Sequence, residues 1–501
     1  MRRYRQTWRP LAEQARFYWF IPEIRSTIES MPRRNLIWIA IILAMATVLL
    51  FVWRQPRRGT TVHQTEFVPV RETYQLIRQA YYQPVDEIKL RQAAVRGMVG
   101  ELDEFSTYFL PEQAKAITHR VKGLDRGLGL RLDLDAKGAR IIGVVPGSPA
   151  HSADLLPGDR ILTVNAIPTA GKTDRQLRDL LAGKLGATVE LQILSPAGWK
   201  KTVMLTHGEF PIETVRGLYR DQKGRWIWEV PSQEGIYYVR IVEFCPKTSR
   251  ALLDVLHQLS PLRGLVLDLR ANPGGLQEIA VALADVFLSR GTIVTVLTRN
   301  DPPKTHQAHD DTPFSKVPMV VLIDETTTSA AEIVAGALGA NARAVLIGRR
   351  TRGKGCVQSM VRLPGELGQI NLTTAEFLIP PDRPIQRRPG GDRWGVAPQI
   401  NVTLSPKQTK TLRRLRIEAE TWPAPALRTT TASDKGSEQI DPRDLLGQKL
   451  LQLDTQLDRA VTLLGKPKEM QAILQRMRTE ISKAAEERKK RAAIQQTNNS
   501  K

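Results

Sequence analysis

Residues 318–358 decide the fold, and they read PMVVLIDETTTSAAEIVAGALGANARAVLIGRRTRGKGCVQ. The apolar, β-branched run at 319–323 is typical of a strand buried in a parallel sheet. A polar turn follows, and residues 329–332 (SAAE) then have the form of a helix capping box. A second apolar strand leads into a loop rich in glycine and arginine. This strand–helix–strand unit predicts an α/β fold with Ser329 and Lys354 at the same edge of the sheet.

Three interpretations fit this stretch. In the simplest, Ser329 only caps a helix and Lys354 is a solvated loop lysine, because capping boxes are common. In the second, residues 348–354 bind phosphate, since they match G-x-x-x-x-G-K. That motif needs Ser or Thr next and a helix after it, whereas Gly355 follows and the residues beyond it alternate like a strand. In the third, Ser329 is a nucleophile and Lys354 is its base.

The third interpretation requires a neutral lysine, because only an unprotonated amine can take a proton from a hydroxyl. Lowering a lysine pKa from about 10.4 to roughly 7–8 costs about 4 kcal/mol, which desolvation can supply. Glycines flank Lys354 on both sides, and an apolar strand precedes its loop. These features suit a lysine packed against backbone.

The same residues resemble the active site of the carboxyl-terminal processing (tail-specific) proteases, which are serine peptidases with a Ser-Lys dyad. In that family a helix opens on S-A-S-A-S-E, and T-F-G-K-G-x-V-Q follows. Here TTSAAE at 327–332 and TRGKGCVQ at 351–358 stand in those places, with the family's spacing of 25 residues between Ser329 and Lys354. The resemblance implies that Ser329 is the nucleophile, that Lys354 is the general base and that Gln358 orients the lysine.

The chain departs from the family pattern at a few positions. Thr327 and Ala331 replace the outer two serines of the turn, neither of which is the nucleophile. Some members carry an aspartate further along the helix, where this chain has Ala340. The sequence therefore predicts no acidic third member of the dyad.

Composition and charge argue against a disulfide-stabilised fold and against nucleic-acid binding. At 501 residues the chain has room for two or three domains, and its two cysteines, Cys245 and Cys356, give no disulfide framework. Residues 1–58 and 406–501 each carry a net charge of +8, which leaves only +6 of the total +22 for the residues between them. Because the basic charge lies mainly at the ends, we expect no nucleic-acid partner.

Residues 36–53 form an uncharged apolar run of 18 residues, with tryptophans near both ends. That length spans a bilayer. Ala44-Met-Ala46 has the form of a signal-peptidase site, but apolar residues continue beyond it, so we interpret 35–53 as an uncleaved membrane anchor. Eight arginines precede residue 35 and three follow at 54–58. This asymmetry predicts a single-pass cell-membrane protein with a cytoplasmic N-terminus (1–34) and an extracytoplasmic, periplasmic-side remainder.

Two segments after the anchor resemble parts of the same family. Residues 60–122 have helical spacing, and L-D-x-x-S-x-Y at 102–108 is similar to the end of the family's N-terminal helical segment. Residues 123–208 are rich in predicted strands and resemble a PDZ domain, with G-S-P-A at 147–150 and L-x-P-G-D-x-I-x-x-V-N at 155–165.

A PDZ domain implies a binding site for a peptide C-terminus. In such domains the peptide adds as a strand, and a glycine-rich loop offers backbone N–H groups to its terminal carboxylate. The residues implied here are Arg126, Gly127, Leu128, Gly129 and Leu130. Together with a helix near 174–181, the two leucines would hold an apolar terminal side chain. A small β domain without a ligand is the alternative.

Residues 209–420 alternate between strand and helix patterns, which predicts βαβ units in a partly parallel sheet. D-L-R-x-N-P-G-G at 268–275 resembles the second signature of the family. By this resemblance, an N–H of Gly274 or Gly275 and that of Ala330 form an oxyanion hole, because glycine lets backbone N–H groups approach a developing charge. An ordinary turn is the alternative.

The remaining features add no cofactor. His306 and His309 stand beside acidic residues, but no further cluster is spaced to complete a zinc site, so we expect no metal and no cofactor. A linker rich in Pro, Thr and Ser at 421–441 leads to a helical region with a basic tail at 442–501.

The predicted fold class is therefore α/β plus β: an N-terminal transmembrane helix, a small helical segment, a PDZ-like β domain and an α/β protease core with a Ser-Lys dyad. The predicted function is a membrane-anchored, extracytoplasmic serine endopeptidase that captures protein or peptide substrates by their free C-termini and cleaves inside them. A catalytically weak PDZ scaffold or chaperone-like binding protein is the alternative. Such a protein would be expected to have changed Ser329 or Lys354, and neither is changed.

Overall fold

The computed structural model describes Met45 and residues 67–499, apart from 222, 310–311, 366 and 422–441. The predicted membrane anchor at 35–53 thus lies, except for Met45, outside the described residues. Within the described ranges, no helix is long and apolar enough to cross a membrane. The chain divides at residue 87 into two units. The described part of the first unit contributes α3 (Val68–Ala80), and α4 (Glu87–Gly100) begins at the boundary.

The centre of the second unit is a sheet in the strand order β10-β13-β14-β17-β18-β22. The parallel strands are β13 (Ile236–Ile241), β14 (Gly264–Asp268), β17 (Met319–Ile323), β18 (Val345–Gly348) and β22 (Ile400–Asn401). The edge strand β10 (Val215–Arg216) is antiparallel. Every residue of β14 and β17 is buried, which accounts for their apolar sequences, broken only by Asp268 at the end of β14. The predicted partly parallel sheet is confirmed.

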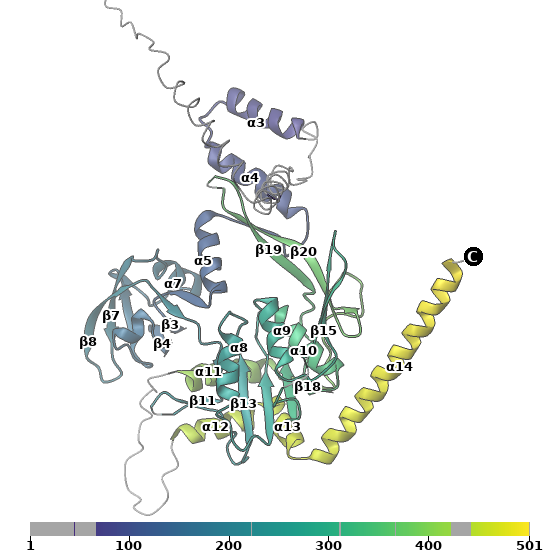
Figure 1. Cartoon of the computed structure of the whole chain (residues 1–501). Coiled ribbons are helices and arrows are strands. Elements are labelled where there is room, and N and C mark those ends of the chain that lie inside the picture. Colours follow the sequence, from purple (N-terminus) through teal and green to yellow (C-terminus); the bar gives the residue numbers. More distant parts are fainter. Residues whose placement is uncertain are drawn as a thin grey trace, which may run out of the picture. The chain divides into compact units, whose positions relative to one another are not determined.

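Helices cover both faces of this sheet (Figure 1). One face packs against α8 (Thr248–Leu256), α9 (Gln277–Asp285) and α10 (Ala330–Ala340). The other face packs against α11 (Pro406–Glu420), α12 (Pro442–Leu453) and α13 (Thr455–Leu464). The C-terminal helices α12 and α13 are therefore part of the core of the α/β domain, and α14 (Pro467–Asn499) follows them.

Helix α10, which begins directly after Ser329, is buried over almost its whole length. Apart from Glu332 it is apolar on every side, as expected for a helix enclosed by protein. Two of its glycines make close packing possible: a Cβ at Gly336 would lie 2.7 Å from Ile379, and one at Gly339 would lie 2.2 Å from Leu346. The position of the Ser329 turn is thus set by a helix that has no room to shift.

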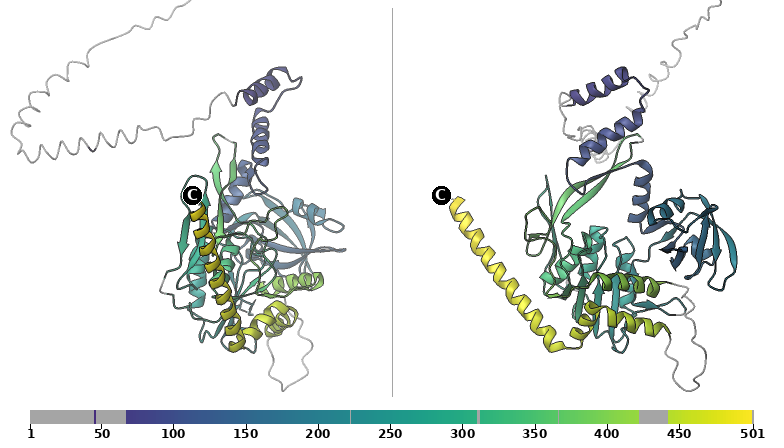
Figure 2. Two further views of the ribbon diagram at one scale, coloured as in Figure 1. Left: turned by 90° about the vertical axis from the view of Figure 1, so that its right-hand side faces the viewer. Right: turned by 180° about the vertical axis from the view of Figure 1, so that it is seen from behind.

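A second sheet lies beyond α10 and contains β19 (Cys356–Arg362), which begins just after Lys354. Its other strands are β1 (Thr107–Phe109), β15 (Thr292–Thr298), β16 (Lys304–Gln307), β20 (Gln369–Ile379) and β21 (Arg383–Pro384). Strands β19 and β20 pair as a long antiparallel hairpin (Figure 2). We call the loop between β18 and β19, residues 349–355, the lysine loop, because it carries Lys354. Because β1 pairs with β20, the chain just before residue 107 is brought close to this loop.

The predicted β domain is present, with strands in the order β3-β4-β5-β7-β8. These strands are β3 (Leu130–Asp135), β4 (Gly138–Val144), β5 (Arg160–Val164), β7 (Thr188–Leu194) and β8 (Lys200–Thr206). The domain has its own apolar core, which includes Ile141, Leu155 and Leu191. Pairing of β2 (Leu124–Gly127) with β9 (Gly208–Pro211) brings the start and the end of the domain together. Short helices α6 (Pro149–Ser152) and α7 (Asp174–Leu180) complete it, and α5 (Pro111–Val121) precedes it.

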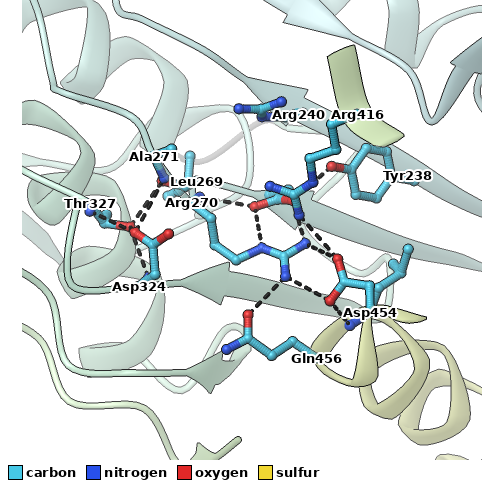
Figure 3. Close-up of polar contacts among 12 residues, drawn as sticks. Tyr238, Arg240, Leu269, Arg270, Ala271, Asp324, Thr327, Arg416, Asp454 and Gln456 are labelled. Carbon is cyan, nitrogen blue, oxygen red and sulfur yellow. Dashed lines mark hydrogen bonds and ion pairs between the residues drawn. The ribbon is translucent and has the colours of Figure 1, made fainter. Parts of the chain in front are cut away.

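A buried ionic network ties the C-terminal helices to the end of β14 (Figure 3). The Arg270 guanidinium donates to both oxygens of Asp454 at 2.8 Å and to Asp268 at 2.7–2.9 Å. Arg416 of α11 contacts both carboxylates, at 3.2 and 3.0 Å. Burial alone would raise the pKa of Asp454, but Arg270 and Arg416 lower it below its usual range. The residues of the D-L-R signature thus fix α11 and α13 to the strand that leads into the 271–275 turn.

This network predicts a large stability cost for Asp454→Ala, because the change leaves two arginines, Arg270 (only 2% exposed) and Arg416, sharing the single carboxylate of Asp268. We expect urea unfolding to show a loss of roughly 3–5 kcal/mol. Because the pKa of Asp454 is depressed on folding, its contribution is present at neutral pH. The difference from wild type should shrink as the pH falls below about 4.

Asp458→Ala is the matched control, since Asp458 is an exposed aspartate in the first turn of the same helix, α13. Equal stability of the Asp454→Ala and Asp458→Ala proteins would show that the network does not hold the C-terminal helices in place.

Candidate active site

Ser329 lies on a strained turn between β17 and α10. Its φ of 57° and ψ of −120° put a residue with a Cβ in a region that favours glycine, at a cost of roughly 1–3 kcal/mol. Strained strand-to-helix turns of this kind can carry nucleophilic serines, because they expose the hydroxyl at the start of a helix. Asp324 fixes the turn by accepting the N–H groups of Thr326 and Thr327 at 3.0 and 2.9 Å (Figure 3 shows Asp324 and Thr327).

Glu332 joins the Ser329 turn to the lysine loop. Its side chain is completely buried, and one oxygen, Oε2, accepts the N–H groups of both Ser329 (2.8 Å) and Lys354 (2.9 Å). The other oxygen accepts the Gly353 N–H at 2.7 Å and the Thr351 hydroxyl. Because two amides share one oxygen, the backbones of Ser329 and Lys354 are neighbours. The capping box was predicted from the sequence, but the contacts of Glu332 with the lysine loop were not.

Burial raises the pKa of the Glu332 carboxyl above its usual range, whereas its four hydrogen-bond donors favour the charged form. Every hydrogen bond that the structure gives this carboxylate is one that it accepts. A side chain of the same size that must also donate would not satisfy this site.

Lys354 is half-buried on the loop between β18 and β19. Desolvation lowers the pKa of its ammonium group below the usual range, and the charge of Arg352 acts in the same direction, while Cys356 and Asp103 oppose it. Its Nζ lies 5.1 Å from the centre of the Phe105 ring. Among the described residues, Nζ has no hydrogen-bond or ion-pair partner. The pKa shift has the direction that a lysine base requires.

The segment that carries Phe105 is held in place by Asp103. The Oδ1 of Asp103 accepts the N–H groups of Phe105 and Ser106 at 2.7 Å, and Oδ2 accepts the Ser106 hydroxyl at 2.8 Å. Ser106 Oγ in turn accepts the N–H of Thr373 in β20 at 3.1 Å. Phe105 occupies an unspecified position of the L-D-x-x-S-x-Y motif, so the sequence pattern gave no signal for its place beside the lysine.

The 271–275 turn lies against the Ser329 turn. Asn272 is buried and accepts the Thr328 N–H on its carbonyl oxygen at 3.0 Å. Gly274 has a φ of 100°, and a Cβ on it would lie 2.9 Å from Ser329 Cβ, so only glycine fits there. The Gly274 N–H donates to Asn272 Oδ1 at 2.8 Å. In the part of the chain that the structure describes, the N–H groups of Gly275 and Ala330 have no hydrogen-bond partner.

Gln358 forms no hydrogen bond with Lys354 in this structure. Its Nε2 donates to Cys356 Sγ at 3.0 Å and to Thr373 at 3.4 Å, so its orienting role stays a prediction. Burial raises the pKa of the Cys356 thiol. A buried thiol of raised pKa is a packed side chain and not a nucleophile.

The five residues of the predicted tail-binding loop line a cavity of about 730 Å³, whose lining also includes Arg216 of β10 and Glu420 of α11. Strand β3 and helix α7 form its sides, with Leu177 and Leu181 among the lining residues. Gly129 has a φ of 77°, and a Cβ on it would lie 2.0 Å from Ser148, so the G-S-P-A motif packs directly on this loop. Arg126 pairs with Glu209 at 2.9–3.0 Å, which already compensates its charge.

Comparison with known proteins agrees with this architecture. Three family models match: peptidase family S41 at residues 235–402, a PDZ domain at 140–195 and the activating protease CtpB N-terminal domain at 53–112. The carboxy-terminal processing protease CtpA of Bacillus subtilis is 30% identical over 352 residues, which cover 70% of this chain and 71% of that protein.

A carboxy-terminal-processing protease of Bartonella bacilliformis is 29% identical over 452 residues, which cover 87% of this chain and 96% of the relative. Among solved structures, the photosystem II D1 C-terminal processing protease shares 28% identity, covers 71% of this chain and 92% of its own, and has a TM-score of 0.42. The chain belongs to the family of carboxy-terminal processing proteases, and it is a serine peptidase of family S41 that carries a PDZ domain.

Proposed function

We propose that this protease cleaves peptide bonds with a dyad in which Ser329 attacks the scissile carbonyl and Lys354 takes its proton. One observation carries the proposal: the amides of Ser329 and Lys354 bind the same oxygen of Glu332. The strained backbone of Ser329 and the lowered pKa of Lys354 support it.

In the proposed mechanism, the neutral Lys354 Nζ leaves the Phe105 ring and accepts the Ser329 proton as Oγ bonds to the carbonyl carbon. The oxyanion that develops is stabilised by the N–H groups of Ala330 and Gly275, aided by the positive end of the α10 dipole. The lysine ammonium then gives its proton to the leaving amine. The neutral lysine next activates the water that hydrolyses the acyl-enzyme. Gln358 would orient Nζ after leaving Cys356.

We further propose that the PDZ domain selects substrates by their free C-termini. The cavity between the 126–130 loop and α7 supports this, because it lies beside the edge strand β3, to which a peptide strand can add. Leu128 and Leu130 would contact an apolar terminal side chain. Since Arg126 is already paired with Glu209, backbone N–H groups would provide most of the carboxylate binding.

We also propose that residues 35–53 anchor the protein in the cell membrane, with the protease on the extracytoplasmic side. The proposal rests on the length and composition of this run and on the arginines that precede it.

The dyad predicts that Ser329→Ala and Lys354→Ala each lower kcat/KM by roughly a thousandfold or more, and that the double variant is no worse, because the two residues act as one unit. Lys354→Arg should fail as well, since a guanidinium stays protonated. Mass spectrometry of a peptide mixture before and after incubation measures the cleavage. Ser359→Ala, which removes an exposed hydroxyl on β19, is the matched control and should retain activity. Wild-type cleavage by Ser329→Ala would refute the dyad.

The role of Glu332 predicts that Glu332→Gln lowers kcat with little change in KM. The NH₂ group of the new glutamine would face one of the N–H or O–H donors of the lysine loop. Each hydrogen bond to the buried charged group that is lost costs roughly 1.5–3 kcal/mol. Steady-state kinetics and a thermal melt measure the two effects. Glu278→Gln, in the first turn of α9, is the control and should match wild type. A wild-type kcat for Glu332→Gln would mean that the carboxylate does not position the dyad.

Tail recognition predicts that amidating the C-terminus of a good substrate slows its cleavage, mainly through a higher KM, because the negative charge is removed far from the scissile bond. The comparison uses the same peptide as free acid and as amide. If both are cut equally well, the PDZ domain is not a tail receptor in this protein.

The anchor predicts that a reporter fused after Lys501 is active outside the cytoplasm and stays in the membrane fraction. If a soluble form is released, N-terminal sequencing shows where it begins. A start near Thr47 would identify the apolar run as a cleaved signal and would contradict the anchor.

A further inference from the structure

Beside the lysine loop lies a second pocket, of about 530 Å³, whose lining is rich in arginine. Arg349, Arg350, Arg352 and Arg387 line it, and its acidic residues are Glu104 and Glu325. We call it the arginine pocket. Its lining charges have a positive balance, although most of the basic charge of the chain lies at the two ends. A positive pocket beside the loop that carries Lys354 can attract a negatively charged group of a substrate.

The wall of the arginine pocket is fixed to the residue before Lys354. The Trp394 ring is flanked by the guanidinium groups of Arg350 and Arg387, at 5.1 and 5.0 Å from its centre, and Arg350 also donates to the Trp394 carbonyl at 2.7 Å. A Cβ on Gly353 would lie 2.8 Å from Trp394 Cδ1, and the Arg387 N–H donates to the Gly353 carbonyl at 2.8 Å. The positions of these arginines are therefore coupled to that of Lys354.

Among the described residues, three of the four arginines have no carboxylate partner, and two of these three are free of the Trp394 carbonyl as well. Arg349 pairs with Glu325 at 3.6 Å and Arg350 packs on Trp394 as described, whereas Arg352 and Arg387 form no ion pair with any described residue. Both are exposed at the pocket. The Arg352 N–H donates to the Thr327 carbonyl at 3.1 Å, which places this arginine against the turn that carries Ser329. Phe105 also lines the pocket and covers the Lys354 amine.

We infer that the arginine pocket binds an acidic side chain of the substrate close to the scissile bond. The inference rests on the proposed function, because it takes the dyad as the point of cleavage. It adds to that function a preference for substrates with an acidic side chain. A guanidinium fork matches the geometry of a carboxylate and can bind it through two hydrogen bonds. An aspartate or glutamate that enters the pocket would meet Arg352 and Arg387, and would fix the peptide next to Ser329.

Binding to the full-length Ser329→Ala protein in detergent tests this directly, because it needs no cleavage. Labelled peptides carry either Glu or Gln at one position at a time on both sides of the scissile bond. We expect one position at which the Glu peptide binds roughly threefold to tenfold more tightly at low ionic strength, with the preference largely screened at about 0.5 M salt.

The preference should disappear when Arg352→Gln or Arg387→Gln is added to the Ser329→Ala protein. Arg388→Gln is the matched control: Arg388 is an exposed arginine of the same segment that pairs with Glu376 at 3.3 Å and does not line the pocket. The Arg388→Gln protein should therefore keep the preference for Glu.

Equal binding of Glu and Gln peptides at every position would overturn the inference, and so would a preference that survives both arginine substitutions. A preference that is lost when the peptide C-terminus is amidated would assign the pocket to the terminal carboxylate and would overturn it as well. Cleavage of the Gln peptides by the wild-type enzyme tests the proposed function separately. If the Lys354→Ala enzyme cuts them as fast as the wild type, the dyad is wrong, while the binding result still decides whether the pocket recognises acidic side chains.

Discussion

The buried carboxylate of Glu332 is the contact on which the arrangement of the site depends. It binds the amide of Ser329 on one side and two amides and a hydroxyl of the lysine loop on the other. Two of these groups, the Gly353 amide and the Thr351 hydroxyl, are buried, so neither could find another partner if the carboxylate were lost. Since Glu332 lies in the first turn of the fully packed helix α10, the rigidity of the core is passed to both residues of the proposed dyad.

The surrounding structure also explains how the strained backbone at Ser329 persists. A residue in such a conformation is stable only where its neighbours over-determine it. Here Asp324 holds the turn from one side, and Gly274 and the carbonyl of Asn272 contact it from the other. The ionic network around Arg270 fixes the strand before that second turn. These contacts, from the two turns and from the ionic network behind them, together support the position of the Ser329 hydroxyl.

Much of this arrangement could be predicted from the sequence, because it follows local patterns. An uninterrupted apolar run identified β17, the capping box identified the start of α10, and parallel topology brought Ser329 and Lys354 to one sheet edge. The rest depends on contacts between distant segments. Arg270 and Asp454 are 184 residues apart, and Phe105 reaches the lysine only because β1 pairs with β20. Proposing Gly275 and not Gly274 for the oxyanion hole likewise needed the hydrogen bond from the Gly274 N–H to Asn272. No periodicity or motif encodes these contacts.

In the proposed mechanism Lys354, whose pKa is lowered by desolvation, is the base that activates Ser329. The pH dependence of acylation of Ser329 by an activated peptide ester measures this most directly, because it isolates the first step from tail binding and product release. We expect a rate that rises with pH through a single ionisation below the ordinary lysine value of about 10.4, and that is lost in Lys354→Ala. An ionisation at the ordinary lysine value, or a rate unaffected by Lys354→Ala, would contradict this mechanism.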